Sequence, residues 1–130
     1  MSNMQTPMKR VRGSGAAGAG TGHFWIQRLT AVANVPLVLF LIVLLLTCMG
    51  ADYVTARNSI ANPLVAITLL LLVLSGVWHM CLGMQLIIED YVHRPGIKVV
   101  MLILNILFSA TIAVACLFAV LKISFSPQFM

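Results

Sequence analysis

The sequence predicts an all-α integral membrane protein with three transmembrane helices. The 130-residue chain is 61% hydrophobic and only 8% charged, which is too little charge to cover the surface of a water-soluble domain. Its apolar residues form three continuous runs, at about 29–49, 63–88 and 97–121. Each run is long enough to cross a bilayer core of about 30 Å as a helix. Because the runs do not alternate polar and apolar residues, they are not strands of a membrane barrel.

The distribution of basic residues predicts the orientation in the membrane. Most of them precede the first run or separate the second from the third, namely Lys9, Arg10, Arg12, Arg28, Arg94 and Lys98. Positive residues concentrate on the cytoplasmic side, so we expect a cytoplasmic N-terminus and a C-terminus outside. Topology and contact with anionic lipid explain the net charge of +5 without a nucleic-acid partner.

Two segments are expected along the chain. Residues 1–22 are rich in Gly, Ala and Ser and predict a flexible polar tail, whereas residues 23–125 form a three-helix membrane domain. The tail lacks the apolar core of a secretory signal peptide and is not amphipathic, so we expect a bacterial inner membrane rather than a mitochondrial one. Three helices bury little surface among themselves, which is typical of a subunit of a larger complex.

His79 is the one ionisable residue deep within a predicted span. Asp90 lies eleven residues later, about 16 Å along a helix, which places His79 near the middle of the bilayer. Ser75, Gly76 and Gly83 share its helix face and leave room for a neighbouring helix or a flat ligand. His79 is therefore either an interhelical hydrogen-bonding residue or an axial haem ligand. In the second case another chain must supply the second histidine.

Arg28, Asp90 and Tyr91 are expected on one side of the membrane and could share a site. Arg28 is either an interfacial anchor or a guanidinium that holds a carboxylate or a ligand carbonyl. Tyr91 can donate a hydrogen bond to a ketone, and Asp90 can hold an arginine or pass protons. The alternative for this pair is a plain helix end, because Pro95 and Gly96 follow. Two carboxylates, Glu89 and Asp90, oppose the helix dipole there, which favours a functional reason.

Two motifs carry a family resemblance. The stretch "QRLTAVANVPL" opens the first span, and "HMCLGMQLIIEDYVH" contains a histidine that ten residues separate from Asp-Tyr. With the order of the spans, they make residues 22–121 similar to the hydrophobic membrane anchor subunits of succinate dehydrogenase, which are the small cytochrome b subunits of complex II. The stretch "TGHFWIQR" matches the family only loosely, so the resemblance gives His23 no role.

The resemblance implies a function within a complex and no catalytic activity of this chain alone. It implies a second cytochrome b anchor subunit that shares one haem b, for which His79 supplies the axial iron ligand on this chain. It also implies a ubiquinone site in which Tyr91 bonds a quinone oxygen beside Asp90, and it places Arg28 near both the haem propionates and the quinone. The flavoprotein and iron–sulfur subunits would hold FAD and the iron–sulfur clusters, and would pass electrons from succinate to ubiquinone.

Two other functions stay open on the residues alone. One is a stand-alone dimeric cytochrome b in which each copy gives its His79 to a shared haem. The other is a small proton-coupled transporter subunit in which His79 relays protons. The three functions differ in their partners and in whether haem is present.

Overall fold

The computed structural model describes residues 6–8 and 20–125, and its elements in order are α2 (Gly20–Cys48), α3 (Tyr53–Ala61), α4 (Pro63–Tyr91) and α5 (Pro95–Phe125). The predicted all-helical class is confirmed. Most of the predicted tail, 1–22, lies outside the described residues, so its boundary with the membrane domain stays a prediction.

Three of these helices are long and apolar enough to cross a membrane. They cover Thr21–Cys48, Pro63–Tyr91 and Pro95–Phe125, with 28, 29 and 31 residues. At 1.5 Å per residue these lengths correspond to about 42–46 Å, more than the hydrocarbon core and close to a whole bilayer. The helices therefore extend past the apolar runs, and the start of α2 and the end of α4 reach into the headgroup region.

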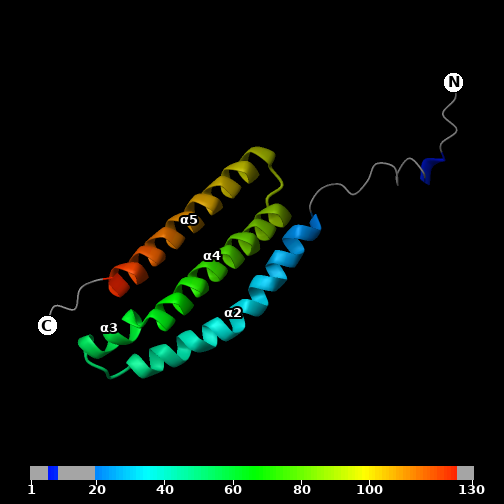
Figure 1. Ribbon diagram of the computed structural model, residues 1–130. Coiled ribbons are helices and arrows are strands. Elements are labelled where there is room, and N and C mark those ends of the chain that lie inside the picture. Colours follow the sequence, from blue (N-terminus) through cyan, green and yellow to red (C-terminus); the bar gives the residue numbers. More distant parts are fainter. Residues whose placement is uncertain (1–5, 9–19, 126–130) are drawn as a thin grey trace.

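Local sequence signals explain where the helices begin and end. Asn62 caps α4, because its side-chain oxygen accepts a hydrogen bond of 3.0 Å from the backbone N–H of Leu64. Pro63 and Pro95 occupy the first helical positions of α4 and α5, where a missing N–H costs nothing. Within α2, Pro36 removes one backbone hydrogen bond, and Figure 1 shows that this helix bends along its length.

The three long helices lie in one layer rather than in a closed bundle. Figure 1 shows α4 in the middle, with α2 antiparallel to it on one side and α5 antiparallel on the other. Helix α4 packs against both neighbours, whereas α2 and α5 have no contact with each other within the described part of the chain. Both broad faces of α4 are consequently only partly covered.

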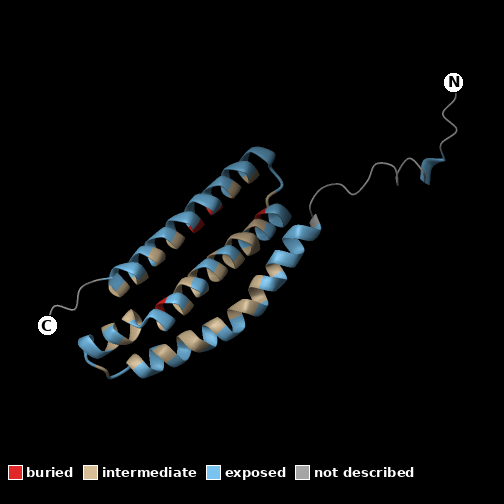
Figure 2. Cartoon of the chain, in the orientation of Figure 1, coloured by how far each residue is buried: buried red, intermediate tan, exposed pale blue. Residues whose placement is uncertain are grey.

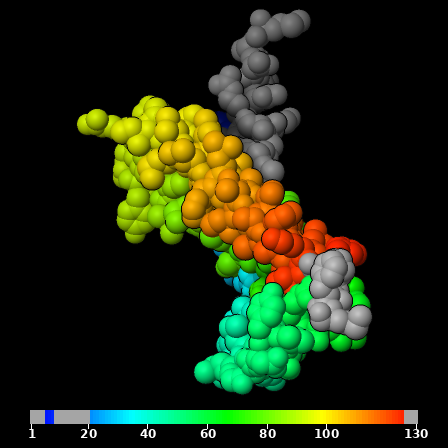
Figure 3. Space-filling view, turned by 90° about the vertical axis from the view of Figure 1, so that its left-hand side faces the viewer, coloured from blue at the N-terminus to red at the C-terminus, as the bar shows by residue number. Residues whose placement is uncertain are grey.

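This layered arrangement buries very little. Among the described residues only four are buried, Ala66 and Ile88 of α4 and Asn105 and Ser109 of α5, as the few red segments of Figure 2 show. Large apolar side chains such as Phe108 and Phe118 of α5 are exposed, and in Figure 3 this helix runs uncovered along the viewed face. An apolar surface of this extent requires lipid or another membrane subunit.

Helix α3 was not predicted. It lies in the connection between the first two spans and begins after Asp52, whose carboxylate accepts a hydrogen bond from the Thr55 hydroxyl. That bond holds the pKa of Asp52 below its usual value. The signal was present in the sequence, because an aspartate three residues before a threonine is a common start for a short helix.

Candidate functional site

Several polar side chains of α2 and α4 meet at the α2–α4 interface. Thr30 Oγ1 of α2 and His79 Nδ1 of α4 are 3.0 Å apart. One turn away, Gln27 faces Gly83 so closely that a methyl group at Gly83 would lie 3.4 Å from Gln27 Nε2. Continuing this antiparallel register by one turn pairs Asn34 with Ser75, and Asn34 Oδ1 and Ser75 Oγ are both buried without a hydrogen-bond partner among the described residues. We call these six residues, Gln27, Thr30, Asn34, Ser75, His79 and Gly83, the polar seam.

His79 occupies the middle of α4, twelve residues before its last residue, Tyr91. The expected interhelical hydrogen bond is present, and it uses only one of the two ring nitrogens. Nε2 has no hydrogen-bond partner among the described residues and is not one of the buried unpaired atoms. A neutral imidazole with one nitrogen bonded to protein and the other free is the usual state of a histidine that ligates a metal.

The space beside His79 is open. A methyl group added at Gly76, one turn before His79, would meet no atom within 4 Å. Glycine at this position therefore leaves α4 without a side chain where another helix or a flat ligand could approach. This opening and the free Nε2 fit an axial ligand of a haem that is shared with another chain.

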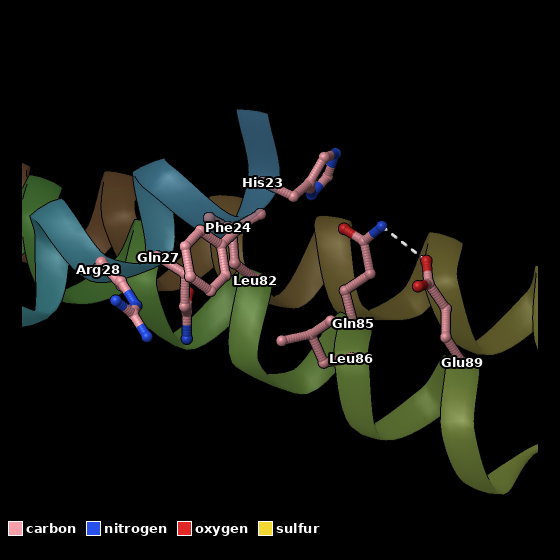
Figure 4. Close-up of a pocket in the computed structure, with 8 residues that line it drawn as sticks. All are labelled: His23, Phe24, Gln27, Arg28, Leu82, Gln85, Leu86 and Glu89. Carbon is pink, nitrogen blue, oxygen red and sulfur yellow. Dashed lines mark hydrogen bonds between the residues drawn. The ribbon is translucent and has the colours of Figure 1, made fainter. Parts of the chain in front are cut away.

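A cavity of about 490 Å³ lies between the start of α2 and the end of α4. It is lined by His23, Phe24, Gln27, Arg28, Leu82, Gln85, Leu86 and Glu89 (Figure 4). Arg28 and Gln27 lie at one end of the labelled group and Glu89 at the other. The cavity thus combines apolar walls with a cation, a carboxylate and two amides, which suits an amphipathic ligand with polar ends.

Within this cavity Arg28 stacks on an aromatic ring. Its guanidinium carbon is 4.2 Å from the centroid of Phe24, and Phe24 in turn packs edge-on against Trp25. No carboxylate among the described residues forms an ion pair with Arg28. The aromatic ring holds the cation in place while its hydrogen-bond donors stay available for an external carboxylate or carbonyl.

The end of α4 is stabilised by contacts that the sequence did not indicate. Lys98 of α5 donates a hydrogen bond of 2.9 Å to the Glu89 carbonyl, which places a cation at the negative end of the α4 dipole. Gln85 donates to the Glu89 carboxylate at 2.8 Å. These bonds offset the unfavourable position of two carboxylates at a helix C-terminus. The bond from Gln85 also orients the Glu89 carboxylate, and both residues line the cavity.

The structure brings together only some of the predicted site residues. Arg28 lines the cavity, whereas Asp90 and Tyr91 are exposed in the last turn of α4 and do not line it. Tyr91 is 79% exposed, and its carbonyl lies 3.1 Å from His93 Nδ1. The residues that sequence reasoning left without a role, His23 and Glu89, are part of the lining. Their positions in the sequence could have indicated this, because His23 lies near Arg28 and Glu89 lies next to Asp90.

Comparisons with known proteins agree on one family. The family model for the succinate dehydrogenase/fumarate reductase transmembrane subunit matches residues 2–121. The succinate dehydrogenase hydrophobic membrane anchor subunit of Rickettsia bellii is 32% identical over 111 residues, which cover 85% of this chain and 89% of the relative. That of Paracoccus denitrificans is 26% identical over 117 residues, or 90% of each chain.

A third relative extends the similarity. The succinate dehydrogenase membrane anchor subunit of Reclinomonas americana is 31% identical over 93 residues, covering 66% of this chain and 74% of the relative. No solved structure matches the chain significantly. The family model spans nearly the whole chain, including the polar seam and most of all three helices. The chain is therefore a multi-pass membrane protein that belongs to the succinate dehydrogenase/fumarate reductase transmembrane subunit family.

Proposed function

We propose that this chain anchors a succinate:ubiquinone oxidoreductase in a bacterial inner membrane, gives His79 to a haem b, and forms part of the ubiquinone-reduction site. The observation that carries the proposal is that one helix interface, α2–α4, holds both a mid-helix histidine with a free Nε2 and, at its end, a cavity with an unpaired arginine. Family membership supplies the context, because these two features are what a haem- and quinone-binding anchor needs.

The open faces of the layer support a partner in the membrane. Exposed apolar side chains cover α2 and α5, and the surface beside Gly76 is open. We infer that a second cytochrome b anchor subunit packs there and brings the other axial histidine. The flavoprotein and iron–sulfur subunits would then dock on the side that carries Arg28, Arg94 and Lys98, which is the cytoplasmic side by the distribution of charge.

In the haem-binding part of this function, His79 would hold the iron through Nε2 and Arg28 would hold a propionate. When bound, the haem would supply one-electron chemistry as a side electron store, or would serve as a structural link between the two anchors. The chain's own contribution is to place one imidazole near the middle of a spanning helix and one guanidinium near the end of another. Both residues are contributed by the α2–α4 interface.

In the quinone-binding part, the polar residues lie where the membrane meets water. The Tyr91 hydroxyl can donate a hydrogen bond to a quinone carbonyl oxygen, and the Arg28 guanidinium can polarise one. Quinone reduction takes up two protons, and Asp90 is exposed in the same turn as Tyr91, where it can pass protons from water. The apolar walls of the adjacent cavity, from Leu82 and Leu86, suit a hydrophobic ring or tail.

The decisive experiment is purification of the tagged chain from its native membrane, with a visible spectrum of the eluate. We expect a flavoprotein, an iron–sulfur protein and a second small membrane subunit, together with a haem b absorbance. A haem-containing eluate with this chain as its one component would support a homodimeric cytochrome instead. An eluate without haem or soluble partners, with proton-coupled flux in vesicles, would support a transporter subunit.

The quinone role is tested by Tyr91→Phe in the assembled complex. We expect the complex to assemble and to keep succinate oxidation with an artificial electron acceptor, while ubiquinone reduction falls by at least about tenfold, since one hydrogen bond to the reacting oxygen is lost. Tyr53→Phe is the matched control, because Tyr53 is equally exposed (80%) but lies in α3 at the other end of the molecule. Full ubiquinone reductase activity in Tyr91→Phe would refute the role.

A further inference from the structure

The hydrogen bond between Thr30 and His79 suggests a function for Thr30 that neither the resemblance nor the family assigns. Thr30 Oγ1 lies 3.0 Å from His79 Nδ1, and it also lies 2.9 Å from the Ile26 carbonyl and 3.1 Å from the Gln27 carbonyl. The contacts with His79 and with the Gln27 carbonyl are partly buried, whereas the contact with the Ile26 carbonyl is exposed. One hydroxyl therefore meets one ring nitrogen and two backbone oxygens.

The Thr30 hydroxyl has one hydrogen to donate, so the group that accepts it determines whether Oγ1 donates to or accepts from each of the others. A carbonyl oxygen can only accept, so a hydroxyl in contact with two of them donates its hydrogen to the backbone of its own helix. The lone pairs of Oγ1 are then free to accept, and the group facing them is His79 Nδ1. In this arrangement Nδ1 carries the ring proton and donates it to Thr30. Nε2, on the far side of the ring, keeps its lone pair.

We propose that Thr30 is a positioning residue for the haem ligand: it accepts the Nδ1–H bond of His79, selects the tautomer with a free Nε2, and fixes the ring plane. This inference rests on the proposed haem-binding role of His79. Metal-ligating histidines generally donate their other N–H to a protein acceptor, which orients the ring and makes it a stronger ligand. For His79 the described part of the chain offers Thr30 as that acceptor.

The neighbouring contacts of the polar seam keep Thr30 in register with His79. The close approach of Gln27 to Gly83 holds α2 against α4 one turn away. A methyl group at Gly83 would lie in ordinary van der Waals contact with Gln27 Nε2, whereas a larger side chain there would displace the Gln27 side chain. Thr30 and His79 are both half-buried, so water competes little for the bond and its geometry is preserved.

The test uses the intact complex with Thr30→Val, which keeps the shape of the side chain and removes the acceptor. We expect haem affinity to fall by about tenfold, as measured by haem retained per complex after detergent titration. We also expect the midpoint potential of the remaining haem to become more positive, because a histidine without its hydrogen-bond acceptor donates less electron density to the iron. Thr30→Ser, which keeps the hydroxyl, should restore both values.

Two controls separate positioning from packing. Thr68→Val removes a hydroxyl that bonds only within α4, at 2.8 Å from the Leu64 carbonyl, and should change neither value. Asn105→Leu removes an interhelical hydrogen bond of 2.9 Å to the Cys81 carbonyl, and should lower stability without moving the potential. If Thr30→Val does not assemble, Thr30→Ala replaces it with the same expectations, because a smaller side chain cannot clash.

Failure of this inference can be told apart from failure of the proposed function. If His79→Ala removes the haem but Thr30→Val matches the wild type in retention and potential, Thr30 has no positioning role and the haem assignment stands. If His79→Ala keeps the haem, or the wild-type complex contains none, both are overturned. A potential that shifts equally in Thr30→Val and Asn105→Leu would also overturn the inference, since it would reflect packing alone.

Discussion

The two interfaces of α4 differ in what they bury. On the α5 side lie the buried residues Ile88, Asn105 and Ser109, and the Asn105 amide donates a hydrogen bond to the Cys81 carbonyl. On the α2 side no described residue of α2 is fully buried, and the contact consists of half-buried polar groups that end in a cavity. We call the α5 side, which holds buried residues of both helices, the closed interface and the α2 side the open one; apolar cavities of about 410 and 420 Å³ also lie between α4 and α5.

This difference separates structural from functional polar residues in a membrane. A polar group that is buried with its hydrogen bonds made holds helices together, as Asn105 does. A polar group that is half-buried, with part of its bonding capacity unused, can take an external ligand. His79 is half-buried and Arg28 is exposed beside the cavity; both have unused bonding capacity, and both lie on the α2 side. Substitutions that change one interface and leave the other intact test this separation.

The largest expected effect comes from His79→Leu, which removes the free Nε2 from the open interface. We expect nearly complete loss of haem from the purified complex, measured as the Soret absorbance per mole of protein, because one axial ligand is gone. His93→Leu serves as the control, since His93 is exposed beyond the end of α4 and bonds only the Tyr91 carbonyl. Equal haem content in His79→Leu and wild type would show that the open interface binds no haem through this residue.

A second prediction concerns the close approach of the helices at Gly83. Gly83→Leu would displace the Gln27 side chain of α2, and we expect a loss of about 1–3 kcal/mol in the stability of the complex. Thermal unfolding of the purified complex measures it. Gly76→Leu is the matched substitution, because within the chain its side chain meets open space. A loss of stability in Gly76→Leu as well would locate the partner subunit or haem against that face.

A third prediction concerns the closed interface. Asn105→Leu should cost about 1 kcal/mol of stability, which is the usual range for an interhelical hydrogen bond in a membrane, and should leave haem content unchanged. Unfolding in mixed detergent micelles measures the stability. Thr111→Val is the control, since the Thr111 hydroxyl bonds only the Leu107 carbonyl in its own helix. Haem loss in Asn105→Leu would mean that the two interfaces are not independent.

The smallest effect is expected outside the membrane, at α3. The Thr55 hydroxyl lowers the pKa of Asp52, so this bond stabilises the folded chain above the unfolded pKa and is lost as the pH falls through the lowered folded pKa. In Thr55→Val the pKa of Asp52 should rise toward its ordinary value of 3.8. A carbon-detected NMR titration of the carboxylate measures the pKa. An unchanged value would show that Thr55 is not the cause.

The apolar runs predicted the three long helices, but not all of their extent. The runs were expected at about 29–49, 63–88 and 97–121, whereas the first helix already begins at Gly20 and the other two continue to Tyr91 and Phe125. Hydropathy identifies residues that prefer lipid, whereas helical hydrogen bonding continues into the headgroups as long as no residue breaks it. Helix α3 was missed for a related reason, because it is short and not apolar.

The candidate site was predicted in part. The depth of His79 followed from helix geometry, and its interhelical hydrogen bond was one of two expected roles. The partner of that bond, Thr30, is 49 residues away in sequence, and no local pattern pairs them. The cavity includes Glu89 and His23 but not the predicted Asp90 or Tyr91. Glu89, Asp90 and Tyr91 are consecutive in α4, and which of them faces the cavity depends on how α4 is rotated about its own axis relative to α2.

The sequence by itself determined that this chain crosses a membrane three times, carries one histidine in the membrane interior, and resembles a known family of anchor subunits. These properties follow from composition, helical periodicity and short motifs, which act within about twenty consecutive residues. The tertiary structure decided that α4 lies between α2 and α5, that Thr30 bonds His79, and that Arg28 stacks on Phe24 beside a cavity. These contacts depend on how whole helices pack against one another, which local sequence does not encode.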